Sequence, residues 1–224
     1  MKLKNIYTTP QNANNVPDLM SAIQKSFDAI CNDPTKKRLI PLIQSGFSLC
    51  GKNSFDDLTI VCQLAILIPE VFDNELKVSL PKAFKLAKKY EDFWRLGCII
   101  CSPKGSLNHT PLLTQIAKKM KGFPMVNSLM MLQTCYFLKV VKMEKEAKEM
   151  ACKLEKKAKS SIGLAQTAMA LKMFKGFDEK AEKAAKAALE LAKTREDFDW
   201  VIMSLGVCHL DKEIDKAVNI MNSL

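Results

Sequence analysis

Eight cysteines and two histidines are the side chains with which this sequence could hold a metal ion or attack a substrate. Cys98 and Cys101 are the only two cysteines at CxxC spacing, and the nearest further ligand in the sequence is His109. A structural zinc site takes four ligands, usually from a second close pair, and a thioredoxin-like motif follows a strand, which the sequence does not predict here. We therefore predict no metal or redox site, no cofactor, and reduced cysteines that mostly pack in the core.

Sequence motifs for catalysis are also missing. The sequence has no Gly-rich phosphate loop, no GxSxG segment and no HExxH segment. Two histidines leave little material for acid–base chemistry. The sequence predicts a protein that is not an enzyme.

Lysine is the charged residue type that recurs in clusters. The chain has 34 basic and 24 acidic residues and a net charge of +10. Ten lysines near the C-terminal ends of predicted helices are candidates for binding a polyanion or another partner, and we call them the lysine ridge: Lys85, Lys88, Lys89, Lys118, Lys119, Lys121, Lys156, Lys157, Lys159 and Lys193. Cations at this end of a helix also offset its dipole by about 0.3–1 kcal/mol, so the same positions are expected without any partner.

The elements that must position these residues are predicted to be helices. The 8 Gly and 9 Pro fall between apolar stretches, strong helix formers dominate after residue 140, and no segment alternates as a strand does. Ser54 is a candidate N-cap for a helix that begins with Asp56 and Asp57 in its first turn. The other predicted helices cover 17–31, 36–50, 73–89, 91–102, 110–120, 125–141, 145–159, 162–174, 179–193, 196–209 and 212–224.

Residues 1–16 are predicted to form a flexible N-terminal arm, and 17–224 a single helical domain. The polar segment after Met1 lacks the apolar core of a signal peptide. No apolar run approaches the length needed to cross a bilayer. We expect a soluble, cytoplasmic protein without membrane insertion.

One phrase occurs twice in the sequence. Residues 86–94 are Leu-Ala-Lys-Lys-Tyr-Glu-Asp-Phe-Trp and residues 191–200 are Leu-Ala-Lys-Thr-Arg-Glu-Asp-Phe-Asp-Trp, which is an offset of 105 residues or three units of 35. Ala87, Ala117, Ala158 and Ala192 mark related copies, and residues 143–147 recur 34 residues later as 177–181. A period of 20–50 residues indicates stacked supersecondary units. We predict a right-handed α-solenoid of about six antiparallel helix hairpins.

Part of the chain resembles the tetratricopeptide-type helical repeats. Residues 176–181, Gly-Phe-Asp-Glu-Lys-Ala, are similar to the start of that family's second helix, and Ala185 and Ala188 stand at its packing positions. The step of 34 residues from Ala147 to Ala181 equals the family's period. The chain departs from the pattern at Lys193, where the family has proline, and lacks the Trp-x-x-Leu-Gly of the first helix. A HEAT-like stack fits almost as well.

An α-solenoid is a scaffold whose surface residues select the partner. The resemblance implies a groove lined by the first helix of each hairpin, and its candidate contact residues are Phe93, Trp94, Phe198 and Trp200. We predict a protein or peptide as the partner. Nucleic acid bound by the lysine ridge is the alternative, although only three basic residues are arginine, which pairs better with phosphates and bases.

Overall fold

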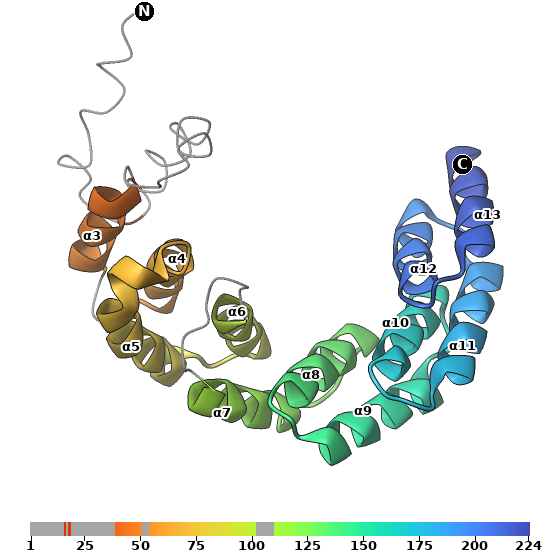
Figure 1. The fold of residues 1–224 in the computed structure, drawn as a ribbon, viewed down its shortest axis with the longest axis horizontal. Helices are drawn as coiled ribbons and strands as arrows, with labels where there is room; N and C mark the ends of the chain where they lie inside the picture. Colours follow the sequence, from red (N-terminus) through yellow and green to blue (C-terminus); the bar gives the residue numbers. More distant parts are fainter. Residues whose placement is uncertain (1–15, 17, 19–38, 51–53, 102–109) are drawn as a thin grey trace, which may run out of the picture. The chain divides into compact units, whose positions relative to one another are not determined.

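The computed structural model describes residues 16, 18, 39–50, 54–101 and 110–224. The predicted arm at 1–16 and the helix predicted over 17–31 lie almost wholly outside these residues, as does His109. The described part contains eleven α-helices and no strand: α3 (Leu39–Leu49), α4 (Phe55–Ala65), α5 (Pro69–Leu86), α6 (Tyr90–Ile100), α7 (Thr110–Lys121), α8 (Ser128–Val140), α9 (Glu144–Lys157), α10 (Ser161–Lys172), α11 (Asp178–Leu191), α12 (Arg195–Val207) and α13 (Asp211–Asn222) (Figure 1). The predicted all-α fold is confirmed.

Helices that follow one another in the chain pack together, and α10 also packs on α8 and α12, which are two helices away in the chain. α4 packs on α5, α8 on α9, α10 on α11 and α12 on α13. The contacts divide the chain into two compact units, unit 1 (residues 1–116) and unit 2 (residues 117–224). None of the described helices is both long and apolar enough to cross a bilayer. The array of sequential helix pairs agrees with the predicted arrangement, and one continuous domain over 17–224 stays a prediction.

In unit 1, α4 contacts α3, α5 and α6. The Ser54 side chain accepts a hydrogen bond from the backbone N–H of Asp57 at 3.2 Å, which confirms the predicted N-cap of α4. α5 begins earlier than predicted because Pro69 occupies its first turn, where the missing N–H has no intrahelical partner to lose. The backbone of α5 departs from helical geometry at Phe72, and Pro81 lies within the helix.

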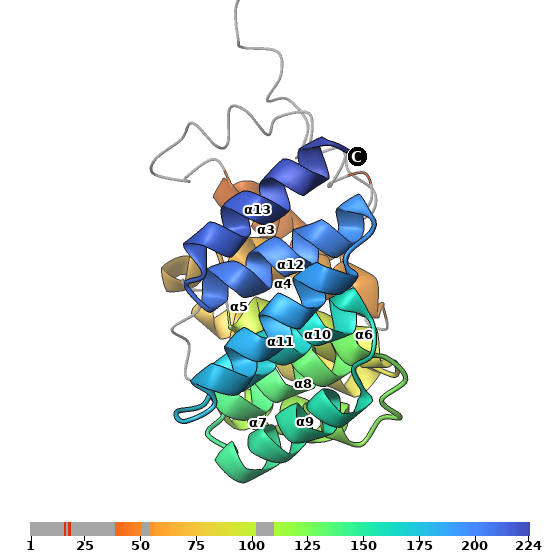
Figure 2. The same ribbon diagram turned by 90° about the vertical axis from the view of Figure 1, so that its right-hand side faces the viewer.

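In unit 2 the helices form two layers. α8, α10 and α12 make the first layer, and α9, α11 and α13 make the second (Figure 1). Figure 2 shows α9, α11 and α13 following one another along the unit. α10 contacts α8, α9, α11 and α12, so it is buried on most of its circumference.

Alanine allows the close approach of α10 and α11. Ala181, Ala185 and Ala188 of α11 are fully buried. The Ser161 hydroxyl of α10 donates a hydrogen bond to the backbone carbonyl of Ala188 at 2.9 Å. Small side chains bring the two backbones near enough for this contact. The buried alanines of α11 are therefore its packing surface against α10.

The repeated phrase builds the same helix start in each unit. In unit 1, Asp92 accepts hydrogen bonds from the backbone N–H groups of residues 88 and 89 at 2.8 and 3.0 Å. In unit 2, Asp197 accepts them from residues 193 and 194 at 3.1 and 3.0 Å. The next residues, Phe93 and Phe198, are buried. The phrase therefore encodes a capped helix N-terminus followed by a core aromatic residue.

The marker alanines show where the sequence copies agree and where they do not. Ala87, Ala158 and Ala192 are the C-caps of α5, α9 and α11, and each has an extended backbone with ψ of 130°, 123° and 133°. Ala117 differs, because it lies inside α7 and is fully buried. Because Ala117 occupies a different structural position from the other three alanines, the four alanines are unequally spaced in the sequence.

The three turns within the hairpins of unit 2 share a left-handed residue. Lys142, Gly176 and His209 have φ of 61°, 83° and 59°. After the last of them, the N–H of Leu210 donates to the carbonyl of Leu205 at 3.0 Å, which is the bond of a Schellman C-cap. The N–H of Met143 likewise donates to the carbonyl of Leu138 at 2.9 Å, so the turns at Lys142 and His209 close with the same kind of bond.

Candidate peptide-binding face

One side of the first layer of unit 2 is open to solvent. Along α8, α10 and α12 this side carries residues spaced by four, three and four, which is the spacing of one helix face. We call the residues that one helix contributes a row. Equivalent residues of the rows on α8 and α10 are 33 residues apart in the sequence, and those on α10 and α12 are 34 residues apart. We call the twelve residues the apolar face: Leu129, Gln133, Tyr136 and Val140 on α8, Ile162, Gln166 and Met169 on α10 with Met173 at its C-cap, and Glu196, Trp200, Met203 and Val207 on α12.

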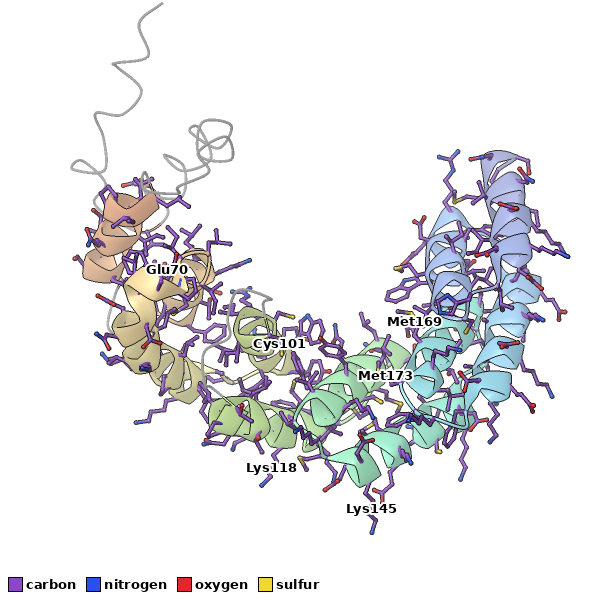
Figure 3. The ribbon with its side chains drawn as sticks, viewed as in Figure 1. Glu70, Cys101, Lys118, Lys145, Met169 and Met173 are labelled. Atoms are coloured by element: carbon purple, nitrogen blue, oxygen red, sulfur yellow. The ribbon has the colours of Figure 1, made fainter. Side chains whose placement is uncertain are left out.

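Most side chains of the apolar face are exposed or half-buried. Tyr136, Met203 and Val207 are exposed by 41%, 45% and 40%. Figure 3 shows Met169 and Met173 on the side of α10 that is turned away from α11, whereas Lys145 projects from α9 on the other side of the unit. Single exposed apolar residues are ordinary, but a contiguous set of them marks an interaction site.

Gln166 is the exception in the apolar face because it is buried. Its side chain is 2% exposed, and within the described residues no donor reaches its Oε1 atom. Gln133 occupies the corresponding position on α8 and is half-buried. A buried carbonyl that accepts no hydrogen bond costs about 1–3 kcal/mol. The middle of the apolar face thus contains an acceptor that the fold itself does not satisfy.

The corresponding helix faces of unit 1 are more polar, although α4 also presents the half-buried Ile60 and is followed by Leu67, which is 37% exposed. Asp56 and Gln63 are exposed on α4, and Glu91, Arg95 and Cys98 are exposed on α6. The Arg95 guanidinium pairs with the Asp56 carboxylate at 2.6 Å and lies over the Phe55 ring. The apolar face is therefore a property of unit 2 and not of every first helix.

The four aromatic residues predicted for a groove have different surroundings. Phe93 and Phe198 are 5% and 2% exposed, so both belong to the core and a partner does not reach them in the folded chain. Trp94 and Trp200 are half-buried. Only Trp200 belongs to the apolar face.

Sequence reasoning missed the methionines and Gln166. The available signal was the register: aligning the three hairpins of unit 2 at steps of 33 and 34 residues places apolar residues at the same positions of α8, α10 and α12. Aromatic residues alone did not reveal it.

All ten lysines of the lysine ridge are exposed. They lie in the last turn of α5, α7 and α9 or in the residues that follow α5, α9 and α11. None of the ten forms an ion pair with an acid of the described chain, whereas Lys139, Lys172, Lys180 and Lys186 do. Each cluster of these lysines is thus available to an anion, but the positions are also those that the helix dipole favours.

Of the described cysteines, Cys62, Cys135 and Cys208 are buried, Cys50, Cys101 and Cys152 are half-buried, and Cys98 is exposed. Burial raises the pKa of Cys62 and of Cys135 to about 12 and that of Cys101 to about 11. Burial also raises the pKa of Cys98. A thiol with a raised pKa stays protonated at neutral pH and is a poor nucleophile. In the described ranges no three His, Cys, Asp or Glu side chains gather as metal ligands would; Cys31 and His109 lie outside those ranges.

No family model, curated protein or solved structure matches this chain. The function is therefore argued from the apolar face and the lysine ridge alone.

Proposed function

We propose that the chain is a non-enzymatic scaffold that binds a protein or peptide along the apolar face. In this proposal the sequential hairpins form a right-handed α-solenoid of about six hairpins, of the tetratricopeptide or HEAT type. One observation carries the binding proposal: three consecutive first helices present apolar side chains at equivalent positions on their open side. A solenoid grows by repetition, so a ligand that crosses the stack meets the same kind of position on each helix.

The residue types of the apolar face suit a peptide ligand. Covering a Val, Leu or Met side chain stabilises a complex by about 1.5–3 kcal/mol when its burial is complete. Met169, Met173 and Met203 have flexible, polarizable side chains that adapt to different partner shapes. Tyr136 and Trp200 add large rings with a polar edge, which are common at the centres of interfaces. The apolar face therefore offers a large apolar contact area and side chains that can adapt to the shape of a peptide.

Random 12-residue peptides displayed against the full chain test this proposal. Peptides that bind should lose at least tenfold in affinity for Met203→Arg, because the interface would bury an unpaired guanidinium. The matched control is Ile220→Arg, which places the same charge on an exposed apolar position of α13, in the second layer. Titration calorimetry should show unchanged binding to this control. Failure to select any peptide, or equal losses in both variants, would contradict the proposal.

The exposed, unpaired lysines of the ridge favour nucleic acid as the second candidate. We expect weak binding of a generic duplex and single strand at every salt concentration, because clustered lysines with interspersed acids lack the geometry of a specific phosphate site. Replacing Lys88, Lys89, Lys118, Lys119, Lys156 and Lys157 by glutamine should leave peptide binding unchanged. Contacts with six to ten phosphates would instead lower the affinity by roughly three to five orders of magnitude between 50 and 200 mM salt. A tight complex with this dependence, lost in the glutamine variant, would establish the nucleic-acid function.

A further inference from the structure

We infer that the ligand of the apolar face is a segment in polyproline-II conformation, and that Gln166 recognises it by accepting a hydrogen bond from a backbone N–H. This inference rests on the proposed peptide binding and specifies its partner. Two observations carry it, the unsatisfied Gln166 acceptor and the residue types around Gln166, together with the usual distance between packed helices.

The buried acceptor is the first observation. Gln166 Oε1 lies among the apolar residues of α10, with Ile162 one turn before and Met169 one turn after on the same face. Folded proteins pair nearly all buried polar atoms, so an exception at a surface of this kind points to a donor from outside. Met169 and Met173 are half-buried and have three rotatable side-chain bonds each, so they can move aside for a backbone that approaches Gln166.

A helical ligand could offer Gln166 a backbone N–H only from its first turn. In an α-helix the backbone N–H groups beyond the first turn are bonded within the helix. A polyproline-II segment has no internal hydrogen bonds, and every residue except proline offers a free N–H. The acceptor at the centre of the face therefore selects an open backbone.

The spacing of the rows then distinguishes polyproline II from a β-strand. Packed helices lie about 8–10 Å apart. Polyproline II repeats every three residues, with a rise of about 3.1 Å each, so equivalent groups recur roughly every 9 Å. Alternate residues of a β-strand recur after only about 6.6–6.8 Å. One turn of polyproline II thus matches the usual distance between two packed helices, and α10 packs on both α8 and α12. The corresponding positions on α8, α10 and α12 are Gln133, Gln166 and Trp200.

The remaining side chains agree with such a ligand. Tyr136 and Trp200 lie in the rows on either side of α10, and aromatic rings are the usual partners of proline-rich segments. Glu196 is the only charged residue of the apolar face. The ligand should accordingly be apolar, rich in proline, and neutral or basic, with a residue other than proline opposite Gln166.

Two synthetic peptides test the inference on the full chain. The first is acetyl-(Leu-Pro-Pro)4-Lys-amide, which offers one N–H per polyproline-II turn along one side. The second carries N-methylleucine in place of each leucine, so a methyl group replaces each of those N–H donors. Calorimetry should show about tenfold tighter binding of the first peptide. This difference should vanish in Gln166→Met and persist in Gln133→Met, the equivalent change on α8.

Each of the other possible outcomes would contradict one part of the inference. Equal binding of the two peptides, or a difference that survives Gln166→Met, overturns the role of Gln166. If neither peptide binds while displayed peptides still require Met203, the polyproline-II ligand is wrong and the proposed function stands. If no displayed peptide binds the apolar face, the proposed function is wrong and this inference is wrong with it.

Discussion

Phe198→Ala should lower the free energy of unfolding by about 3–5 kcal/mol, the usual cost of removing a buried aromatic ring. The Phe198 side chain is 2% exposed beneath the start of α12, so its loss leaves a cavity in the core of unit 2. Urea unfolding followed by far-ultraviolet circular dichroism measures the change. Trp200→Ala is the control within the same helix: its half-buried ring should contribute less to stability and more to peptide binding.

The opposite pattern would reverse the assignment of these two residues. If Phe198→Ala kept the stability of the parent chain and abolished peptide binding, Phe198 would be a contact residue as the sequence suggested. Its burial in the folded chain argues for the core.

Sequence spacing could not separate these two aromatic residues. Each residue of an α-helix is turned by about 100° from the one before, so Phe198 and Trp200 point in directions about 200° apart. The sequence shows both as large apolar residues near the start of a helix. Which direction meets a neighbouring helix depends on the packing of α12 against α13, which follows it after a turn, and against α10, from which α11 separates it in the chain. The structure was needed to tell core from surface.

Local features were predictable because few residues determine them. Ser54 as an N-cap, the helices themselves and the repeated phrase all depend on neighbours within about four residues. The phrase was recognised in the sequence, and the structure explains it as a capped helix start with Asp92 or Asp197 as the acceptor. Repetition of a local device is thus visible without coordinates.

The apolar face was hidden for a different reason. α10 contacts four other helices, so nearly all of its positions are apolar or small and no amphipathic period marks its open side. Gln166 looked like any polar residue in a helix. Only the alignment with α8 and α12 shows that its position belongs to a row, and only burial shows that its carbonyl has no donor.

Gln166→Met should raise the free energy of unfolding by about 1–3 kcal/mol. Methionine has nearly the same length and volume as glutamine, so it fills the same space. It removes a buried carbonyl that loses its water on folding and accepts no hydrogen bond from the described chain. For a chain of this size, each 1 kcal/mol corresponds to a rise of about 2–4 °C in Tm, and differential scanning calorimetry measures it. Gln133→Met should give no such rise, because the half-buried Gln133 amide can exchange hydrogen bonds with water.

A gain in stability combined with weaker ligand binding would identify Gln166 as a residue kept for function at the expense of the fold. A loss of stability in Gln166→Met would show instead that the side-chain amide already has its partners in the free protein. Its Oε1 would then have no bond left to offer a ligand, and recognition through Gln166 would be refuted by the same measurement.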